Sequence, residues 1–356
     1  MKALIFRSHL DWSFVSRASR WHLRWYLSGR GLPLSAGVYL TSACNCKCVM
    51  CDIWMDKGRR PDIYPRQAQE RDIQALARAG CYYYSISGGE PTLVKDLTDR
   101  LTVAARHLPY VHVVTNGLTM GADLARALGQ TGIKEISLSL DGSRRIHDLL
   151  RGIDGAFVKT MAALDHLEEQ APHLQIVVNS VVTPYNIDGL RELRRLLAPR
   201  ERVRFKLLPM TFHPLFLTGD RQGLVLDLEP APVAAVDAFL DEAMADPRNV
   251  NSRVFLARAK RYLAGERDLL REQKRCLYPH HAMEFDAKGN AFPCLTGMAG
   301  QGGRPPETDL GDYLASPDYR SRQKALEACD GCRNSMMLCY FEPRLNFPIN
   351  HLLRNR

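Results

Sequence analysis

Short apolar runs alternate with amphipathic stretches throughout residues 36–210. The runs are rich in β-branched and aromatic residues, which favours strands. The stretches between them repeat apolar side chains at the helical spacing of three to four residues. The runs are GVYLT (37–41), YYYSIS (82–87), HVVTN (112–116), EISLSLDG (135–142), QIVVNSVVT (175–183) and VRFKLLPM (203–210). Strands that alternate with helices form parallel sheets, so the sequence predicts an α/β fold, a partial (β/α)6 barrel of the TIM type.

Polar and cysteine-rich segments follow the ends of these strands. CNCKCVMC (44–51) comes after the first strand and GGEP (88–91) after the second, while Asn116, Asp141 and Asn179 lie at or near the ends of later strands. In barrels of this type the chemistry gathers at the carboxyl ends of the strands. The sequence therefore predicts one functional site at that end of the sheet.

Three further segments flank the predicted barrel at 36–210. The sequence predicts a basic, aromatic helical segment at residues 1–35. It predicts a helical connector at residues 211–275, with helices near 231–246 and 252–274. From residue 276 to residue 356 the texture changes to loops, glycines and cysteines, which predicts a small cysteine-rich α+β extension.

The positive charge is concentrated at the N-terminus of this 356-residue chain, whose net charge is +9. On a helix, Phe14, Ala18, Trp21 and Trp25 share one face, and Arg17, Arg20 and Arg24 form a neighbouring stripe. Two interpretations follow: peripheral contact of residues 1–30 with an anionic membrane, or a helix packed across the barrel mouth with its arginines in water. The pattern favours the second.

The chain shows neither a signal peptide nor an apolar run long enough to span a membrane. We therefore expect a cytoplasmic protein, with peripheral attachment to the inner membrane surface as the alternative. In a reducing compartment, clustered cysteines indicate metal binding or catalysis more often than disulfides. The basic composition alone is weak evidence for a nucleic-acid partner, and none is expected.

The loop at residues 44–51 holds four cysteines, three of them spaced as Cys44-x3-Cys48-x2-Cys51. Cys46 falls between them, too close to Cys44 and Cys48 along the chain to form an unstrained disulfide with either. Structural zinc usually takes four ligands that arrive as two pairs. An iron–sulfur cluster held by three thiolates would leave one iron open. On spacing alone, both zinc and iron remain possible.

Together with GGEP (88–91) after the second strand, the Cys44-x3-Cys48-x2-Cys51 loop resembles the radical S-adenosylmethionine (radical SAM) superfamily over residues 36–210. The resemblance implies a [4Fe–4S] cluster on these three cysteines, with S-adenosylmethionine bound at the open iron. It implies an enzyme that cleaves S-adenosylmethionine reductively to a 5′-deoxyadenosyl radical, which removes hydrogen from a substrate. An electron donor such as flavodoxin or ferredoxin would supply the electron.

The same resemblance implies a set of cofactor contacts. By similarity, GGEP would position the methionine end of S-adenosylmethionine, and the fourth strand would reach its carboxylate and ribose. The implied residues are Gly88, Gly89, Glu90, Ser139 and Asp141, with Asn116, Asn179 and Arg151 as weaker candidates. Met50 stands where the family usually has an aromatic residue near the adenine. Cys46 is interpreted as a bystander thiol and Cys81 as a small core residue.

A second cysteine group follows residue 275. A predicted hairpin with its turn at DAKGN (286–290) brings Cys276 and Cys294 together, and CDGC (329–332) adds a pair. With four residues between Gly289 and Cys294, this segment resembles the SPASM/twitch extension of radical SAM enzymes. The resemblance implies one auxiliary [4Fe–4S] cluster on Cys276, Cys294, Cys329 and Cys332, with zinc as the alternative. Cys339 would be a spare thiol, a cluster ligand in place of one of these four, or a hydrogen-atom donor.

Several functions are compatible with these features. The favoured one is a radical SAM oxidoreductase acting on an anionic, sugar-linked or lipid-linked small molecule, with the auxiliary cluster accepting the second electron. The alternatives are a peptide maturase that crosslinks or epimerises a small precursor, a redox-neutral sugar epimerase and, more remotely, a metal-stapled nucleic-acid-binding protein. The 43 residues before Cys44 are too few for the recognition domain of many maturases, so the sequence favours the peptide interpretation less.

Overall fold

The computed structural model describes residues 12–29, 31–55, 61–211, 226, 228–266, 269, 276–294, 301–329, 331–332 and 336. Its strands are β1 (Ser35–Tyr39), β2 (Tyr83–Ser87), β3 (Tyr110–Thr115), β4 (Glu135–Ser139), β5 (Gln175–Val182), β6 (Val203–Pro209), β7 (Ala282–Phe285) and β8 (Ala291–Phe292). They form one sheet in the order β6-β5-β4-β3-β2-β1-β7-β8, and every pairing is parallel except the one between β7 and β8. The predicted parallel α/β fold is confirmed.

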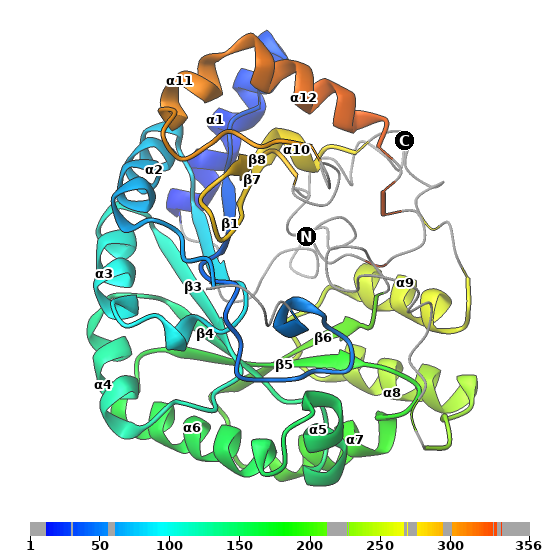
Figure 1. The fold of residues 1–356 in the computed structure, drawn as a ribbon. Coiled ribbons are helices and arrows are strands. Elements are labelled where there is room, and N and C mark those ends of the chain that lie inside the picture. The colour runs from blue at the N-terminus through cyan, green and yellow to red at the C-terminus, as the bar shows by residue number, and fades with distance from the viewer. Residues whose placement is uncertain are drawn as a thin grey trace.

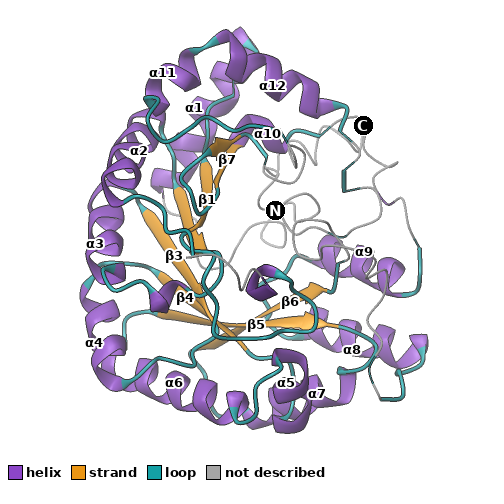
Figure 2. Ribbon diagram, viewed as in Figure 1, coloured by secondary structure: helices purple, strands orange, loops and turns teal. Residues whose placement is uncertain are grey.

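The helices are α1 (Trp12–Ser28), α2 (Arg66–Ala79), α3 (Leu97–His107), α4 (Ala122–Gln130), α5 (Arg144–Arg151), α6 (Ala156–Gln170), α7 (Ile187–Leu196), α8 (Val233–Ala245), α9 (Arg253–Leu263), α10 (Tyr278–His281), α11 (Leu310–Ala315) and α12 (Pro317–Glu327). Short 3-10 turns lie at Ile53–Met55 and Pro91–Leu93. Figures 1 and 2 show the sheet curving as an open barrel, with α2 to α7 around its convex outer face.

The alternation of side chains along the strands explains this arrangement. Val38 and Ile86 belong to the hydrophobic core and are fully buried, whereas the residues on either side of them in β1 and β2 are only half-buried. Burying the outer face against amphipathic helices is the main stabilising contribution of such a layered fold.

The C-terminal hairpin joins the main sheet. Strand β7 pairs with β1, and β8 pairs with β7 in antiparallel orientation, so the predicted hairpin is confirmed. Its turn contains Gly289 at a φ of +88°, where an added Cβ would lie 2.7 Å from the ring of Tyr64. The sheet thus continues across the boundary expected at residue 276.

Two helical predictions differ from the structure. The second connector helix was expected to reach residue 274, but α9 ends at Leu263, followed by Gly265 at a φ of +98°. Residues 267, 268 and 270–274 of that prediction lie outside the described residues. Helix α5 was not predicted, because its sequence RRIHDLLR is short and largely polar.

Helix α1 packs at the amino end of β1 rather than across the barrel mouth. The Nε1 atom of Trp21 donates to the carbonyl oxygen of Leu32 at 2.8 Å, and the rings of Trp25 and His280 meet edge to face. These contacts place α1 at the end of the sheet opposite the cysteine loop, which follows the carboxyl end of β1. None of the described helices is both long and apolar enough to cross a membrane.

Candidate functional site

The cysteine loop after β1 rests on the carboxyl end of α5. The backbone N–H groups of Lys47 and Val49 donate to the carbonyl oxygens of Arg151 and Leu150, both at 3.0 Å. Gly152 ends α5 at a φ of +64°, and an added Cβ there would lie 2.4 Å from the carbonyl oxygen of Lys47. The close approach of loop and helix therefore requires glycine.

The segment after β2 packs on the other side of the same loop. The N–H groups of Gly89 and Glu90 donate to the carbonyl oxygens of Thr41 and Ala43, both at 2.7 Å. A Cβ on Gly89 would lie 2.0 Å from the Ala43 oxygen, and Gly88 has a φ of +118°. In this structure the two glycines let GGEP brace the backbone just before Cys44.

Glu90 is 1% exposed and its carboxylate accepts hydrogen bonds from within the protein. Oε1 accepts from the N–H and hydroxyl of Thr92 and from the hydroxyl of Thr115, while Oε2 accepts from the N–H of Asn116 at 2.7 Å. Burial raises the pKa of this carboxyl above its usual value, against the opposing effect of these bonds. Glu90 thereby ties the end of β2 to the end of β3.

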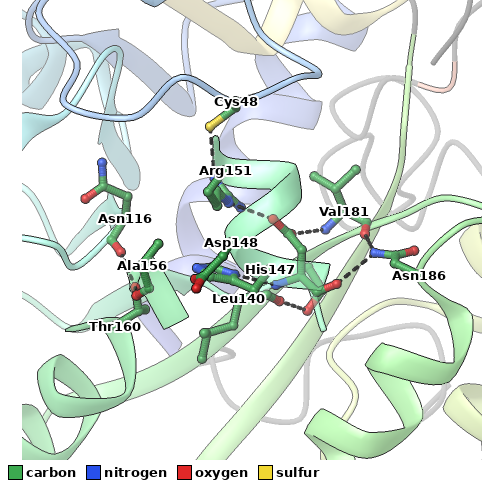
Figure 3. Close-up of polar contacts among 12 residues, drawn as sticks. Cys48, Asn116, Leu140, His147, Asp148, Arg151, Ala156, Thr160, Val181 and Asn186 are labelled. Carbon is green, nitrogen blue, oxygen red and sulfur yellow. Dashed lines mark hydrogen bonds and ion pairs between the residues drawn. The ribbon is translucent and has the colours of Figure 1, made fainter. Parts of the chain in front are cut away.

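Asn116 links the end of β3 to the cysteine loop. Its Nδ2 donates to the side-chain oxygen of Asn45 at 2.7 Å, and its backbone oxygen accepts from the hydroxyl of Thr160 (Figure 3). Its own side-chain oxygen accepts from the N–H of Leu118. Asn116 is therefore a brace of the loop in this structure.

A buried ion pair between Arg151 and Asp141 contacts the cysteine loop. Nε of Arg151 donates to Oδ2 of Asp141 at 2.6 Å, and its Nη1 lies 3.8 Å from Sγ of Cys48 (Figure 3). Asp141 is fully buried and the Arg151 side chain is nearly so. Burial works to lower the pKa of Arg151, but the charges of Asp141 and Cys48 outweigh it and raise that pKa. The structure thus brings together three residues that the sequence marked separately.

Asp141 is itself fixed by neighbours that the sequence did not single out. Its Oδ1 accepts from the N–H of Val181 at 2.8 Å, its backbone oxygen accepts from Nδ2 of Asn186, and its N–H donates to Nδ1 of His147. Burial lowers the pKa of His147 to about 4. No motif marks Asn186 or His147. The only local signal was Ser143 before α5 and Gly152 after it, which are typical helix ends.

The thiols of the loop lie close to one another and are free of disulfides. Hydrogen bonding with Cys46 lowers the pKa of Cys44, and it lowers the pKa of Cys48 to about 6 with a further contribution from Arg151, against the opposing effect of burial. Burial raises the pKa of Cys51 to about 11. Cys46 lies between two of the predicted ligands and hydrogen-bonds with both, and its interpretation as a bystander stays a prediction.

Ser139 and Asn179 lie side by side on β4 and β5, since their Cα atoms are register partners. The Oδ1 atom of Asn179 is buried and has no hydrogen-bond partner. Met50 lies half-buried in the turn before Cys51. Cys81 is fully buried at the amino end of β2, and burial raises the pKa of its thiol to about 12, so its assignment to the core is confirmed.

The described cysteines of the second group pack against two different hydrophobic clusters. Cys294 and Cys329 pack against Phe292 and Leu326, whereas Cys276 and Cys332 pack against the core between α8 and α9. The N–H of Cys276 donates to the carbonyl oxygen of Glu327 at 2.9 Å, which brings its segment to the end of α12. Cys339 lies outside the described residues.

Across the described ranges, no three His, Cys, Asp or Glu side chains are arranged to hold a metal ion. Each thiolate of an iron–sulfur cluster binds a different iron, so a cluster does not need its ligands to converge on one point.

Residues 38–197 match the family model described as "Radical SAM superfamily", and this segment is a radical SAM domain. The mycofactocin maturase MftC of Mycolicibacterium smegmatis is 33% identical over 173 residues, which cover 48% of this chain and 43% of MftC. The sporulation killing factor maturation protein SkfB of Bacillus subtilis is 28% identical over 166 residues, which cover 46% of this chain and 39% of SkfB. The chain thus spans less than half the length of these relatives.

The fold likeness extends further along the chain than these matches. The structure of SuiB from Streptococcus suis bound to its precursor peptide SuiA has a TM-score of 0.63 and 18% sequence identity, and the alignment covers 90% of this chain and 74% of SuiB. At that identity the comparison shows a shared fold. It also agrees with the predicted partial barrel.

The cofactors of a radical SAM domain are a [4Fe–4S] cluster and S-adenosylmethionine, and the residues present fit both. Cys44, Cys48 and Cys51 are thiols on one loop, the donor type that iron–sulfur clusters require. Asn179 offers a buried oxygen without a partner beside Ser139, where a hydroxyl or ammonium group of a ligand could donate to it.

Proposed function

We propose that the chain is a radical SAM peptide maturase, which removes hydrogen from a small precursor peptide and leaves the peptide oxidised. The observation that carries this is the match of its radical SAM domain to MftC and SkfB, two proteins named for maturation. These matches support the peptide alternative over the small-molecule substrate favoured from the sequence. The short N-terminal segment argued against peptides, but a recognition unit on a separate chain would remove that argument.

In this proposal each site residue has a defined task. Cys44, Cys48 and Cys51 would hold the cluster, while Ser139 and Asn179 would bind S-adenosylmethionine. When bound, the two cofactors together supply a radical strong enough to remove hydrogen from carbon. Glu90, Asn116 and Asp141 would position the loop, because each already makes hydrogen bonds within the protein.

The Asp141–Arg151 pair places a fixed positive charge beside Cys48. A cation at that position favours the thiolate form, which is the form that binds iron. The Asp141 carboxylate accepts hydrogen bonds from both Val181 and Arg151. If the guanidinium moved away, the buried carboxylate would lose its cation, which is energetically costly. We interpret Asp141 as a positioning residue that acts through Arg151.

The second cysteine group would hold one auxiliary [4Fe–4S] cluster on Cys276, Cys294, Cys329 and Cys332. Removing one hydrogen atom from a peptide leaves a radical, and a stable crosslink requires the loss of a further electron and a proton. The auxiliary cluster would accept that electron, and a flavodoxin or ferredoxin would reduce the first cluster. The peptide would then lose two hydrogens per turnover.

The test uses the full chain, reconstituted anaerobically with iron and sulfide. The enzyme is incubated with S-adenosylmethionine, dithionite and synthetic peptides encoded by short reading frames beside its gene, and the products are measured by mass spectrometry. We expect one peptide to lose the mass of two hydrogens with matching release of 5′-deoxyadenosine, and Cys48→Ala to abolish both. Release stimulated by a sugar phosphate or another small anion, and by no peptide, would refute the proposal.

A further inference from the structure

Helix α1 turns an apolar stripe toward solvent at the amino end of the sheet. Tyr26, Leu27 and Leu23 are 87%, 74% and 59% exposed, the highest values of any large apolar side chain in the described part of the chain, and Val15 is also exposed. At 100° per residue these positions share one side of the helix, whereas Trp21 points to the opposite side and is buried. A stripe of this kind on a single short helix is a feature of interaction surfaces.

Arginines adjoin this stripe and extend onto neighbouring elements. Arg20 and Arg24 lie on α1, Arg78 lies at the end of α2, and Arg320 lies on α12. Among the described residues none of the four has an acidic partner, and the only side-chain bond is from Nε of Arg20 to the backbone oxygen of Ser16. Their charges are thus available to an external anion.

These arginines border a continuous groove between α1, α2 and α12. Two cavities of about 740 and 440 Å³ share Arg24, Arg78 and Leu32 in their linings. The rest of the lining is mostly small or apolar, and no aspartate or glutamate lines either cavity. The groove therefore combines a cationic border with an apolar floor.

We propose that this end of the molecule binds to an anionic lipid bilayer, with α1 lying in the plane of the interface. An anionic bilayer offers phosphate groups to the arginines and an acyl boundary to Leu23, Tyr26 and Leu27, and tyrosine is favoured at that boundary. A nucleic acid would satisfy the arginines and leave the apolar stripe in water. Arginine stems can lie along apolar surface while the guanidinium reaches the headgroups.

This orientation leaves the other end of the sheet open. Helix α1 packs near Leu32 and Leu34, at the amino end of β1, whereas the cysteine loop follows the carboxyl end of the same strand. Bilayer binding at one end therefore does not cover the candidate site. The inference is independent of the proposed peptide substrate.

The test is flotation of the purified full chain with phosphatidylcholine vesicles that contain or lack phosphatidylglycerol. We expect partition onto the anionic vesicles at low salt, weaker partition as salt rises, and little onto phosphatidylcholine alone. Each arginine near the surface is worth about a fivefold change in partition, so Arg20→Gln/Arg24→Gln/Arg78→Gln should weaken it on the order of a hundredfold. Leu23→Gln/Leu27→Gln should also weaken it, because it removes the apolar contact.

Matched controls separate this surface from general attraction. Arg106→Gln/Arg144→Gln/Arg195→Gln removes the same charge from exposed positions on α3, α5 and α7, and Val158→Gln/Leu196→Gln removes exposed apolar side chains from α6 and α7. Circular dichroism establishes that each variant is folded. Equal losses for test and control variants would overturn the proposal, as would failure of the native chain to bind anionic vesicles. Sensitivity to the arginines but not to the leucines would overturn the proposed position of α1 in the interface and indicate attraction to the bilayer surface by charge alone.

Discussion

Arginine side chains are in different environments at the two ends of the sheet. At the carboxyl end Arg151 is buried, paired with Asp141 and in contact with Cys48. At the amino end Arg24 and Arg78 are exposed, and no described acidic side chain pairs with them. A buried and paired charge fixes the geometry of its neighbours, whereas an exposed and unpaired charge is available to a partner. The contrast agrees with the chemistry proposed at one end and the association proposed at the other.

The largest expected difference between the ends concerns two buried cysteines. Cys48→Ala removes a proposed cluster ligand, so it should abolish S-adenosylmethionine cleavage and lower the iron content by about four per chain, the content of one cluster. Cys81→Ala removes a buried thiol at the amino end of β2 and should leave the iron content unchanged. Iron and sulfide analysis of the reconstituted proteins measures both. Equal iron in the two variants would refute the ligand assignment.

Cys46 sharpens the same assignment, because it lies between Cys44 and Cys48. If it is not a ligand, Cys46→Ala should keep the full iron content. Loss of iron in Cys46→Ala together with retention in Cys44→Ala would replace Cys44 by Cys46 in the ligand set.

The second prediction compares two arginines. Arg151→Gln leaves the carboxylate of Asp141 buried without its cation, and removing one partner of a buried pair costs about 3–5 kcal/mol of unfolding free energy. Arg24→Gln changes an exposed side chain without an acidic partner and should change that free energy by less than about 0.5 kcal/mol. Chemical denaturation of the two variants gives both values. Similar unfolding free energies for the two variants would mean that the buried ion pair does not stabilise the folded chain.

Much of the fold could be predicted from local sequence features, whereas part of the candidate site could not. The six barrel strands and the position of GGEP were predictable, because strand periodicity and the βα order are properties of neighbouring residues. The contact between Arg151 and Cys48 was not, because it joins residues 103 positions apart through a short polar helix. The pairing of β7 with β1 is non-local in the same sense. The substrate class was not predictable, because it depends on a partner that leaves no pattern in this chain.

The third prediction concerns pH. The pKa of His147 falls to about 4 in the folded chain because of burial, below its ordinary value of 6.5. The unfolded chain therefore binds the proton first, and the free energy of unfolding should fall by about 3 kcal/mol as the pH drops from 6.5 to 4. His147→Gln should remove that part of the slope.

The matched histidine at the other end is His22, on α1. Its pKa is also lowered by burial, but the side chain is only half-buried. His22→Gln should therefore change the pH dependence of the unfolding free energy less than His147→Gln does. Denaturation curves at several pH values test the order, and a larger effect of His22→Gln would reverse the comparison of the two ends.

The smallest expected difference concerns two helix-ending glycines. Gly152 ends α5 and Gly80 ends α2, with φ values of +64° and +94°, so alanine is strained at both. Only at Gly152 would the new Cβ collide, at 2.4 Å from the Lys47 oxygen, whereas nothing lies within 4 Å at Gly80. Gly80→Ala should cost about 1 kcal/mol of unfolding free energy and Gly152→Ala 1–2 kcal/mol more, roughly the cost of a local backbone shift. Because that shift moves the cysteine loop, Gly152→Ala alone should also lower iron retention; equal stability and iron content in the two variants would mean that α5 does not position the loop.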